Sequence, residues 1–289
     1  MLMMAVALFA GFALALDGFT APANLLNIVR SVSVLGILAA GMGIVVIGRG
    51  IDLSMVSIMV VTVAIQLQLL QAGWSLWSAS AVVAAITLAL GFMNGFMVAY
   101  AGVSALFATL ASSAFVFGFV RSRILGLPVD VVVFLAVVAV ALVLLRWSRP
   151  GRFLYLMGDN FQAARTMGIP VRPLIVASFM ASALLAWLAG VASAVSLQSM
   201  NTRLVNSALL YDVVLVVVIG GIGLSGGKGG MRNVVVGALL IGILLNGMTI
   251  LNLPNIHQNL IKALILLGAI ILDGQLNPRD EQTSQQGDI

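Results

Sequence analysis

The sequence Gly158-Asp159-Asn160-Phe161-Gln162-Ala163-Ala164-Arg165-Thr166-Met167-Gly168-Ile169 interrupts a chain of 289 residues that is otherwise almost continuously apolar. It lies in a segment from Arg146 to Pro173 that holds five of the chain's fourteen basic residues and a single acid, Asp159. A polar connector between two apolar stretches needs only a few residues. A longer charged segment with its own helical signals therefore indicates a docking element for a soluble partner.

The helical signals in this segment are capping residues. Pro150 and Gly151 are predicted to break the preceding helix. Residues 160–167 are predicted to form a short helix, with Asp159 or Asn160 as its N-cap and Gly168 as its C-terminal stop.

The composition outside this segment indicates an integral membrane protein. The chain is 62% hydrophobic and 8% charged, whereas soluble domains carry about 25% charged residues. Membrane β-strands would alternate polar and apolar residues over about ten positions, and no such alternation is seen, so an all-α helical bundle is expected. The absence of cysteine excludes disulfides, thiolate catalysis and cysteine-based metal sites. A net charge of +5 does not indicate nucleic-acid binding, because the basic residues are not clustered on a soluble domain.

A ruler of about 20 residues per membrane-spanning helix predicts a polytopic bundle of about ten transmembrane helices. The predicted spans are residues 2–18, 27–48, 50–70, 77–99, 104–121, 128–146, 173–197, 208–223, 233–252 and 256–273. Residues 1–274 then form a single transmembrane domain that includes the segment 146–173, and residues 275–289 form a polar tail.

The basic residues predict the orientation of these spans, because Lys and Arg are enriched in cytoplasmic loops. With six spans before the segment 146–173 and four after it, both termini share its side of the membrane. That side collects Arg49, Arg146, Arg149, Arg152, Arg165, Arg172, Lys228, Arg232 and Arg279, and the opposite side Arg121, Arg123 and Arg203. Nine against three predicts that the segment and both termini are cytoplasmic.

A glycine-rich run precedes the ninth predicted span. Gly221, Gly223 and Gly226 match the spacing of a dinucleotide fingerprint, but an apolar span precedes them and no acid follows at the required distance. We interpret the run as a helix break at the cytoplasmic face. The many glycines inside the spans are interpreted as small residues that let helices approach closely in lipid.

Four polar residues inside or beside the spans are candidates for function. Asp52 is interpreted first as a helix cap or as a local ion pair with Arg49, and second as part of a path for solute. Asp212 is expected near the outer end of its span as a solvated cap. Asn94 and Asn246 either line a polar path or make hydrogen bonds between helices, and the sequence does not separate the two. No Ser/His/Asp set, carboxylate pair or metal cluster is apparent, so no covalent chemistry is expected.

In this order along the chain, several short motifs resemble one family. Gly50-Ile51-Asp52-Leu53-Ser54 is similar to a Gly-Ile-Asp-Leu-Ser signature, Asn94-Gly95 to the next landmark, and residues 158–169 to a Gly-x-Asn-x-x-Ala-Ala-x-x-x-Gly-Ile cytoplasmic segment. Val218–Gly221, Gly226–Gly229, Gly237-Ala238, Asn246-Gly247, Lys262 and Leu272-Asp273 follow in family order. The chain thus resembles the permease subunits of bacterial ABC importers of the ribose/xylose type, within the ribose and branched-chain amino-acid superfamily.

The resemblance implies a subunit without enzymatic activity of its own in the bacterial inner membrane. It would pair with a second permease copy, two ATPase subunits that hold ATP and Mg²⁺, and a periplasmic solute-binding protein that delivers a small polar solute, expected to be a monosaccharide. No cofactor is expected in this chain. The residues expected to contact the ATPase are Arg152, Gly158, Asp159, Asn160, Ala163, Ala164, Arg165, Gly168 and Ile169. The residues expected along the translocation path are Gly50, Asp52, Ser54, Asn94 and Asn246.

Two other classes compete with this interpretation. A self-sufficient secondary transporter or channel would need titratable residues inside the membrane, for which the sequence offers few candidates. A structural subunit of a larger membrane complex would show no solute-stimulated ATPase activity with any partner.

Overall fold

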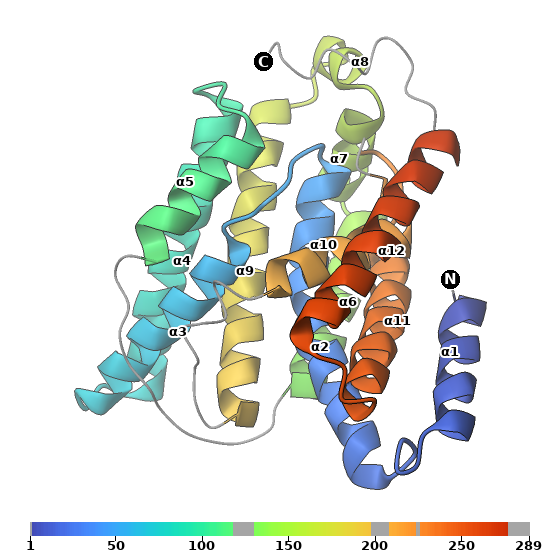
Figure 1. Ribbon diagram of the computed structural model, residues 1–289. Coiled ribbons are helices and arrows are strands. Elements are labelled where there is room, and N and C mark those ends of the chain that lie inside the picture. The colour runs from blue at the N-terminus through green and yellow to red at the C-terminus, as the bar shows by residue number, and fades with distance from the viewer. Residues whose placement is uncertain (1, 118–129, 198–207, 224–225, 277–289) are drawn as a thin grey trace.

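The computed structural model describes residues 2–117, 130–197, 208–223 and 226–276, and every regular element in these ranges is an α-helix. The helices are α1 (Leu2–Ala15), α2 (Pro22–Ile47), α3 (Met55–Gln71), α4 (Leu76–Ala99), α5 (Ala105–Phe117), α6 (Asp130–Trp147), α7 (Arg149–Asp159), α8 (Phe161–Thr166), α9 (Val171–Leu197), α10 (Leu209–Gly220), α11 (Met231–Ile250) and α12 (Asn255–Leu276). They form one bundle (Figure 1).

Four of these helices are long and apolar enough to cross a membrane: α2, α4, α11 and residues 171–194 of α9. α1, α3, α10 and parts of α6 and α12 are shorter apolar helices. The expectation of an all-helical membrane protein is therefore confirmed. The span predicted to begin at residue 50 was wrong at its start, because α3 begins only at Met55 and the residues before it form a loop.

The centre of the bundle is formed by α2 and α9. α9 packs along α2, α3 and α4, and α2 also contacts α6, α10 and α11. The second half of α2 is buried almost without interruption from Leu35 to Ile47, apart from the partly exposed Ile44. A helix that is apolar on all sides fits this central position, since it meets a neighbouring helix on each face.

Glycines allow the closest of these contacts, as the sequence predicted. A Cβ atom at Gly91 of α4 would lie 2.7 Å from the Cα of Met180, and one at Gly95 would lie 2.5 Å from the Cα of Val176, both on α9. These distances are shorter than a real side chain permits. The small residues let the two backbones touch, which is the main source of helix association where the solvent is lipid.

The predicted short helix is present at one end of the bundle as α8, near the top in Figure 1. Asn160, not Asp159, is its N-cap, because its side-chain oxygen accepts a hydrogen bond from the Ala163 amide at 2.9 Å. Gly168 lies just beyond the C-cap with a positive φ of 76°. Only glycine adopts this angle without steric cost, so the predicted stop is confirmed.

A second helix was not predicted. Pro150 and Gly151 were interpreted as helix breakers, but they lie in the first turn of α7, whose N-cap is Ser148. The Ser148 hydroxyl accepts from the Gly151 amide at 3.0 Å. Proline is favoured in a first turn because its missing N–H would be unpaired there in any case. The error came from treating proline as a stop when the preceding serine made it part of a start.

Candidate functional site

The predicted docking residues divide by exposure between the outside and the inside of the protein. Arg152, Asp159, Asn160, Arg165 and Gly168 are exposed. The exposed residues of α7 and α8 therefore present both signs of charge at this end of the bundle.

The remaining predicted docking residues face inward. Ala164 is fully buried, Ile169 and Gly158 are buried, and Ala163 is partly exposed. Ala164 was expected to contact the ATPase; its side chain is buried within this chain, and contact with a partner stays a prediction. The Ala164 side chain holds α8 against the protein's own core.

Three segments that are far apart in the sequence meet directly beneath α8. We call this contact the three-way junction; it consists of residues 47–49, 158–159 and 226–229. The Gly227 amide donates to the Ile47 carbonyl at 3.0 Å. A Cβ atom at Gly227 would lie 2.6 Å from the Asp159 amide nitrogen. The backbones are thus in contact, and the glycine run serves to fit this junction.

Arg49 links the junction through its side chain. Its Nε donates to the Gly158 carbonyl at 2.7 Å, and its Nη2 donates to the Asp159 carbonyl at 2.8 Å. Its backbone has a positive φ of 68°, a left-handed conformation that costs a non-glycine residue roughly 1–2 kcal/mol. Glycine occupies both neighbouring positions, 48 and 50, so the strained position carries the one side chain that can make these bonds.

Two ionisable side chains at this junction, Arg49 and Tyr155, have pKa values that are shifted by burial. Burial lowers the pKa of the Arg49 guanidinium, and the nearby Asp159 carboxylate raises it in part. An arginine keeps its charge at neutral pH despite such shifts. Burial raises the pKa of the Tyr155 hydroxyl, so this group stays protonated and donates to the Gly229 carbonyl at 2.8 Å.

A second group of polar side chains lies inside the bundle. We call it the buried polar cluster; it consists of Asp52, Ser54, Asn94 and Ser182. Asp52 accepts from the Ser54 hydroxyl at 2.6 Å, from the Ser54 amide at 3.0 Å and from the Ser182 hydroxyl at 2.7 Å. The Asn94 amide donates to the Ser54 hydroxyl at 2.8 Å. The cluster joins the loop before α3 to α4 and α9.

The cluster decides one alternative for Asp52. Arg49 does not pair with it, because the guanidinium is bound to the two carbonyls of the junction. Of the two local interpretations, the structure fits the cap better than the ion pair, since Asp52 accepts a hydrogen bond from the amide of Ser54, the residue before α3. Sequence distance concealed the partner on α9, 130 residues away. Asp52, Ser54 and Asn94 have no exposed surface, and a role of these residues in the translocation path stays a prediction.

Asn246 belongs to a different contact. It exchanges two hydrogen bonds with Asn24 of α2, at 2.9 and 3.0 Å. Both Asn94 and Asn246 therefore make hydrogen bonds between helices, one of the two interpretations left open by the sequence. Gly50 is partly exposed and lies between Val45 and Phe179.

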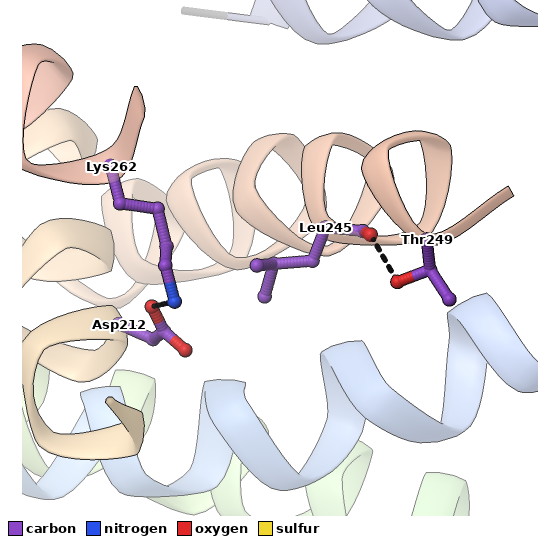
Figure 2. Close-up of polar contacts among 4 residues, drawn as sticks. All are labelled: Asp212, Leu245, Thr249 and Lys262. Carbon is purple, nitrogen blue, oxygen red and sulfur yellow. Dashed lines mark hydrogen bonds and ion pairs between the residues drawn. The ribbon is translucent and has the colours of Figure 1, made fainter. Parts of the chain in front are cut away.

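The most unexpected contact is a buried ion pair. Lys262 of α12 lies 2.8 Å from an Asp212 carboxylate oxygen on α10, with 9% and 11% of the two side chains exposed (Figure 2). Asp212 was predicted to be a solvated cap, and that prediction was wrong. In Figure 2 the pair lies beside α11, where the Thr249 hydroxyl donates to the Leu245 carbonyl at 2.8 Å. Both charged residues are visible in the sequence, but no local pattern pairs positions 50 residues apart.

These features define a class before any comparison. The described residues form an apolar helical bundle with internal polar contacts and a charged, capped helix at one end, which is the architecture of a polytopic membrane protein. Among the described residues, no group of three or more His, Cys, Asp or Glu could hold a metal ion. The comparisons with known proteins give the particular family.

Residues 101–270 match the family described as the branched-chain amino acid transport system / permease component. The ribose import permease of Escherichia coli K12 is 32% identical over 276 residues, which cover 87% of this chain and 86% of the relative. The ribose import permease of Bacillus subtilis is 30% identical, over 88% of this chain and 86% of the relative. An autoinducer 2 import system permease of Yersinia enterocolitica is 29% identical, over 90% and 77%. No solved structure matches the chain.

The chain therefore belongs to this family of permease components, in the branch of the ribose-type ABC importers. It is a multi-pass membrane protein and a permease subunit. The resemblance read from the short motifs is confirmed.

Proposed function

We propose that this permease carries a small polar solute, and most simply a monosaccharide, across the bacterial inner membrane. Relatives with about nine-tenths coverage of this chain are named for the import of ribose and of autoinducer 2, and they support this substrate class. Delivery would come from a periplasmic solute-binding protein. ATP and Mg²⁺ would be bound by a separate ATPase subunit, and the permease would act as a homodimer.

The proposed topology has ten transmembrane spans, formed by α1 to α6 and α9 to α12. α7 and α8 would lie on the cytoplasmic side with both termini. The basic residues support this orientation, because Arg146 and Arg172 flank α7 and α8, and Arg149 and Arg152 lie in α7 itself. In Figure 1, α12 also ends on the side of the bundle where α8 lies.

The proposed docking element is the exposed face of α7 and α8. Arg152 and Arg165 would pair with acidic groups of the ATPase. Asn160 would preserve the helix through its cap, and the buried Gly158, Ala164 and Ile169 would hold the helix on the bundle. The single observation that carries this proposal is the capped α8, seated on the protein through the buried Ala164 while its one charged residue, Arg165, is left exposed.

The experiment is a pull-down of the tagged permease from mild detergent, followed by an ATPase assay. We expect an ATP-hydrolysing subunit to co-purify with the wild-type protein. Arg165→Glu should reduce the recovered ATPase at least fivefold, because it reverses the charge of an exposed docking residue. Arg232→Glu is the matched control, since Arg232 is an exposed arginine in the first turn of α11, and it should leave recovery unchanged.

The outcome can go against the proposal in two ways. A stable permease that never recovers an ATPase would favour the secondary transporter, for which Asp52 and Asp212 are titratable groups inside the bundle. If Arg165→Glu and Arg232→Glu recover equal amounts of ATPase, α8 is not part of the docking surface. Binding of ¹⁴C-ribose by the cognate solute-binding protein, and its uptake by proteoliposomes, test the substrate class separately.

A further inference from the structure

The loop between α2 and α3, residues 48–54, belongs to both polar sites described above. Arg49 at its start contacts the three-way junction beneath α8. Asp52 and Ser54 at its end belong to the buried polar cluster, which reaches α9 and α4. Arg49 and Asp52 are three positions apart in the chain, so their Cα atoms lie at most about 10 Å apart.

The loop is also held internally by backbone hydrogen bonds. The Arg49 and Gly50 amides donate to the Val46 and Val45 carbonyls, each at 2.9 Å. The Leu53 amide donates to the Thr109 hydroxyl of α5 at 3.1 Å. A Cβ atom at Gly50 would lie 2.7 Å from a Val45 methyl group, which shows how closely the loop turns back on α2. A short loop fixed in this way moves as a unit.

We propose that loop 48–54 transmits movement of α8 into the membrane helices, with Arg49 as its attachment to the junction and Asp52 as its attachment to α9. This inference rests on the proposed docking of an ATPase at α8. It assigns Arg49 and Asp52 as positioning residues, since neither needs to touch the ATPase or the solute.

The contacts at the junction explain why α8 cannot move alone. Arg49 binds the carbonyls of Gly158 and Asp159, the two residues that end α7. Asn160, which caps α8, follows directly. The Gly158 and Gly227 backbones are in direct contact, since a Cβ atom at Gly158 would lie 2.3 Å from the Gly227 nitrogen. A displacement of α8 therefore either carries Arg49 with it or breaks two charge-assisted hydrogen bonds.

The contacts at the other end explain where the movement goes. The Ser182 hydroxyl attaches Asp52 to α9, and Asn94 attaches Ser54 to α4. These two helices touch backbone to backbone at Gly91 and Gly95. A shift of the loop thus changes the hydrogen bonds of two membrane-spanning helices close to where their backbones touch, and such a network of packed and hydrogen-bonded residues is one that can carry coupling between distant sites.

The test uses a reporter inside the bundle that does not depend on knowing the solute. The chain has no cysteine, so Ser57→Cys introduces a single thiol. Ser57 is 1% exposed and lies in the first turn of α3, where its hydroxyl contacts Ser113 at 2.6 Å. The permease, in complex with its co-purified ATPase in nanodiscs, is labelled with N-ethylmaleimide before and after trapping with ATP and vanadate. We expect trapping to change the labelling rate at least fivefold.

The variants separate transmission from docking. Arg49→Gln removes the charged two-pronged donor and should reduce the trapping effect to less than twofold, while the amount of bound ATPase stays within twofold of the parent. Arg232→Gln, the exposed arginine of α11, should retain the full effect. A full trapping effect in Arg49→Gln, or no trapping effect in the parent complex while its ATPase is active, would overturn the proposal.

A second pair of variants guards against misfolding of Arg49→Gln. Ser182→Ala removes only the hydrogen bond from α9 to Asp52. Its matched control is Ser178→Ala, a buried serine one turn earlier whose hydroxyl donates only to the Ile175 carbonyl of its own helix, at 2.7 Å. Loss of the trapping effect in Ser182→Ala but not in Ser178→Ala supports transmission through the cluster. Equal effects of the two variants overturn it. Failure of every variant, and of the parent, to bind an ATPase would contradict the proposed function instead.

Discussion

The buried ion pair between α10 and α12 allows a quantitative prediction. Replacing Lys262 by methionine keeps most of the side-chain length but leaves the Asp212 carboxylate without its cation. At 2.8 Å, the attraction between two unit charges is about 6 kcal/mol for an effective dielectric constant of about 20. The desolvation of both groups offsets much of this attraction, and breaking a buried pair on one side typically costs about 3–5 kcal/mol. We expect a loss of that size in the free energy of unfolding for Lys262→Met, and a similar loss for Asp212→Leu.

The double variant distinguishes a paired charge from two independent effects. Replacing a buried pair by two apolar side chains is often neutral or stabilising, so Asp212→Leu/Lys262→Met should unfold within about 1 kcal/mol of the wild type. The measurement is unfolding in mixed micelles of increasing dodecyl sulfate content, followed by far-UV circular dichroism. Asp17→Asn, at an exposed carboxylate, serves as a control with an effect within about 0.5 kcal/mol.

The reasoning would be refuted by additive losses. If the double variant loses the sum of the two single losses to within about 0.5 kcal/mol, the two side chains do not interact in the folded protein. Losses below about 1 kcal/mol in both single variants would indicate that water reaches the pair and that it behaves as a surface salt bridge.

Two further predictions concern packing and capping. Gly95→Ala places a methyl group against the Val176 backbone and should lower the free energy of unfolding by about 1–3 kcal/mol, measured by the same assay. The control is Gly11→Ala, where nothing lies within 4 Å and no loss is expected. Equal losses in the two variants would contradict close packing of α4 on α9. Asn160→Ala removes the cap of α8 and should cost about 1 kcal/mol of local stability, seen as roughly fivefold faster amide exchange at Ala163 and Ala164. Gln162→Ala is the control and should leave amide exchange unchanged. Unchanged exchange in Asn160→Ala would show that the Asn160 side chain does not stabilise α8.

Much of the fold could be predicted because a membrane-spanning helix is a long run of apolar residues, which the sequence shows directly. A long apolar run such as the one that forms α2 can be recognised without knowledge of the tertiary structure. The glycines at positions 91 and 95 indicate close helix packing because they have no side chain. The start of α3 was misplaced because an apolar window does not show where its helix begins, although residues 50–54 include Asp52 and Ser54. The loop forms because its polar groups, including Asp52, find partners on α9, and such partners are not visible in a local window.

The site was predictable in its residues and less so in their roles. Asp52, Ser54 and Asn94 were singled out separately, and the structure brings them into one hydrogen-bonded group. Arg49 was noted as a topological charge and as a possible ion-pair partner of Asp52, because nothing in the sequence joins it to carbonyls more than 100 residues away. Its signal, in retrospect, is an arginine held between two glycines at a turn. Ala164 was listed as an ATPase contact from the family resemblance, and a six-residue helix gives too few positions for the sequence to tell its buried face from its exposed face.

The three-way junction also bears on how the protein is made. Its parts come from the end of α2, from the α7–α8 boundary and from the glycine run before α11. The end of α2 and the α7–α8 boundary are synthesised before the glycine run, so the junction is incomplete when α8 is made. The surface offered to the ATPase would form only once Gly227 has left the ribosome and the preceding helix has entered the membrane. On the proposed docking, a permease truncated before Gly227 would lack one of the three segments that form the seat of α8.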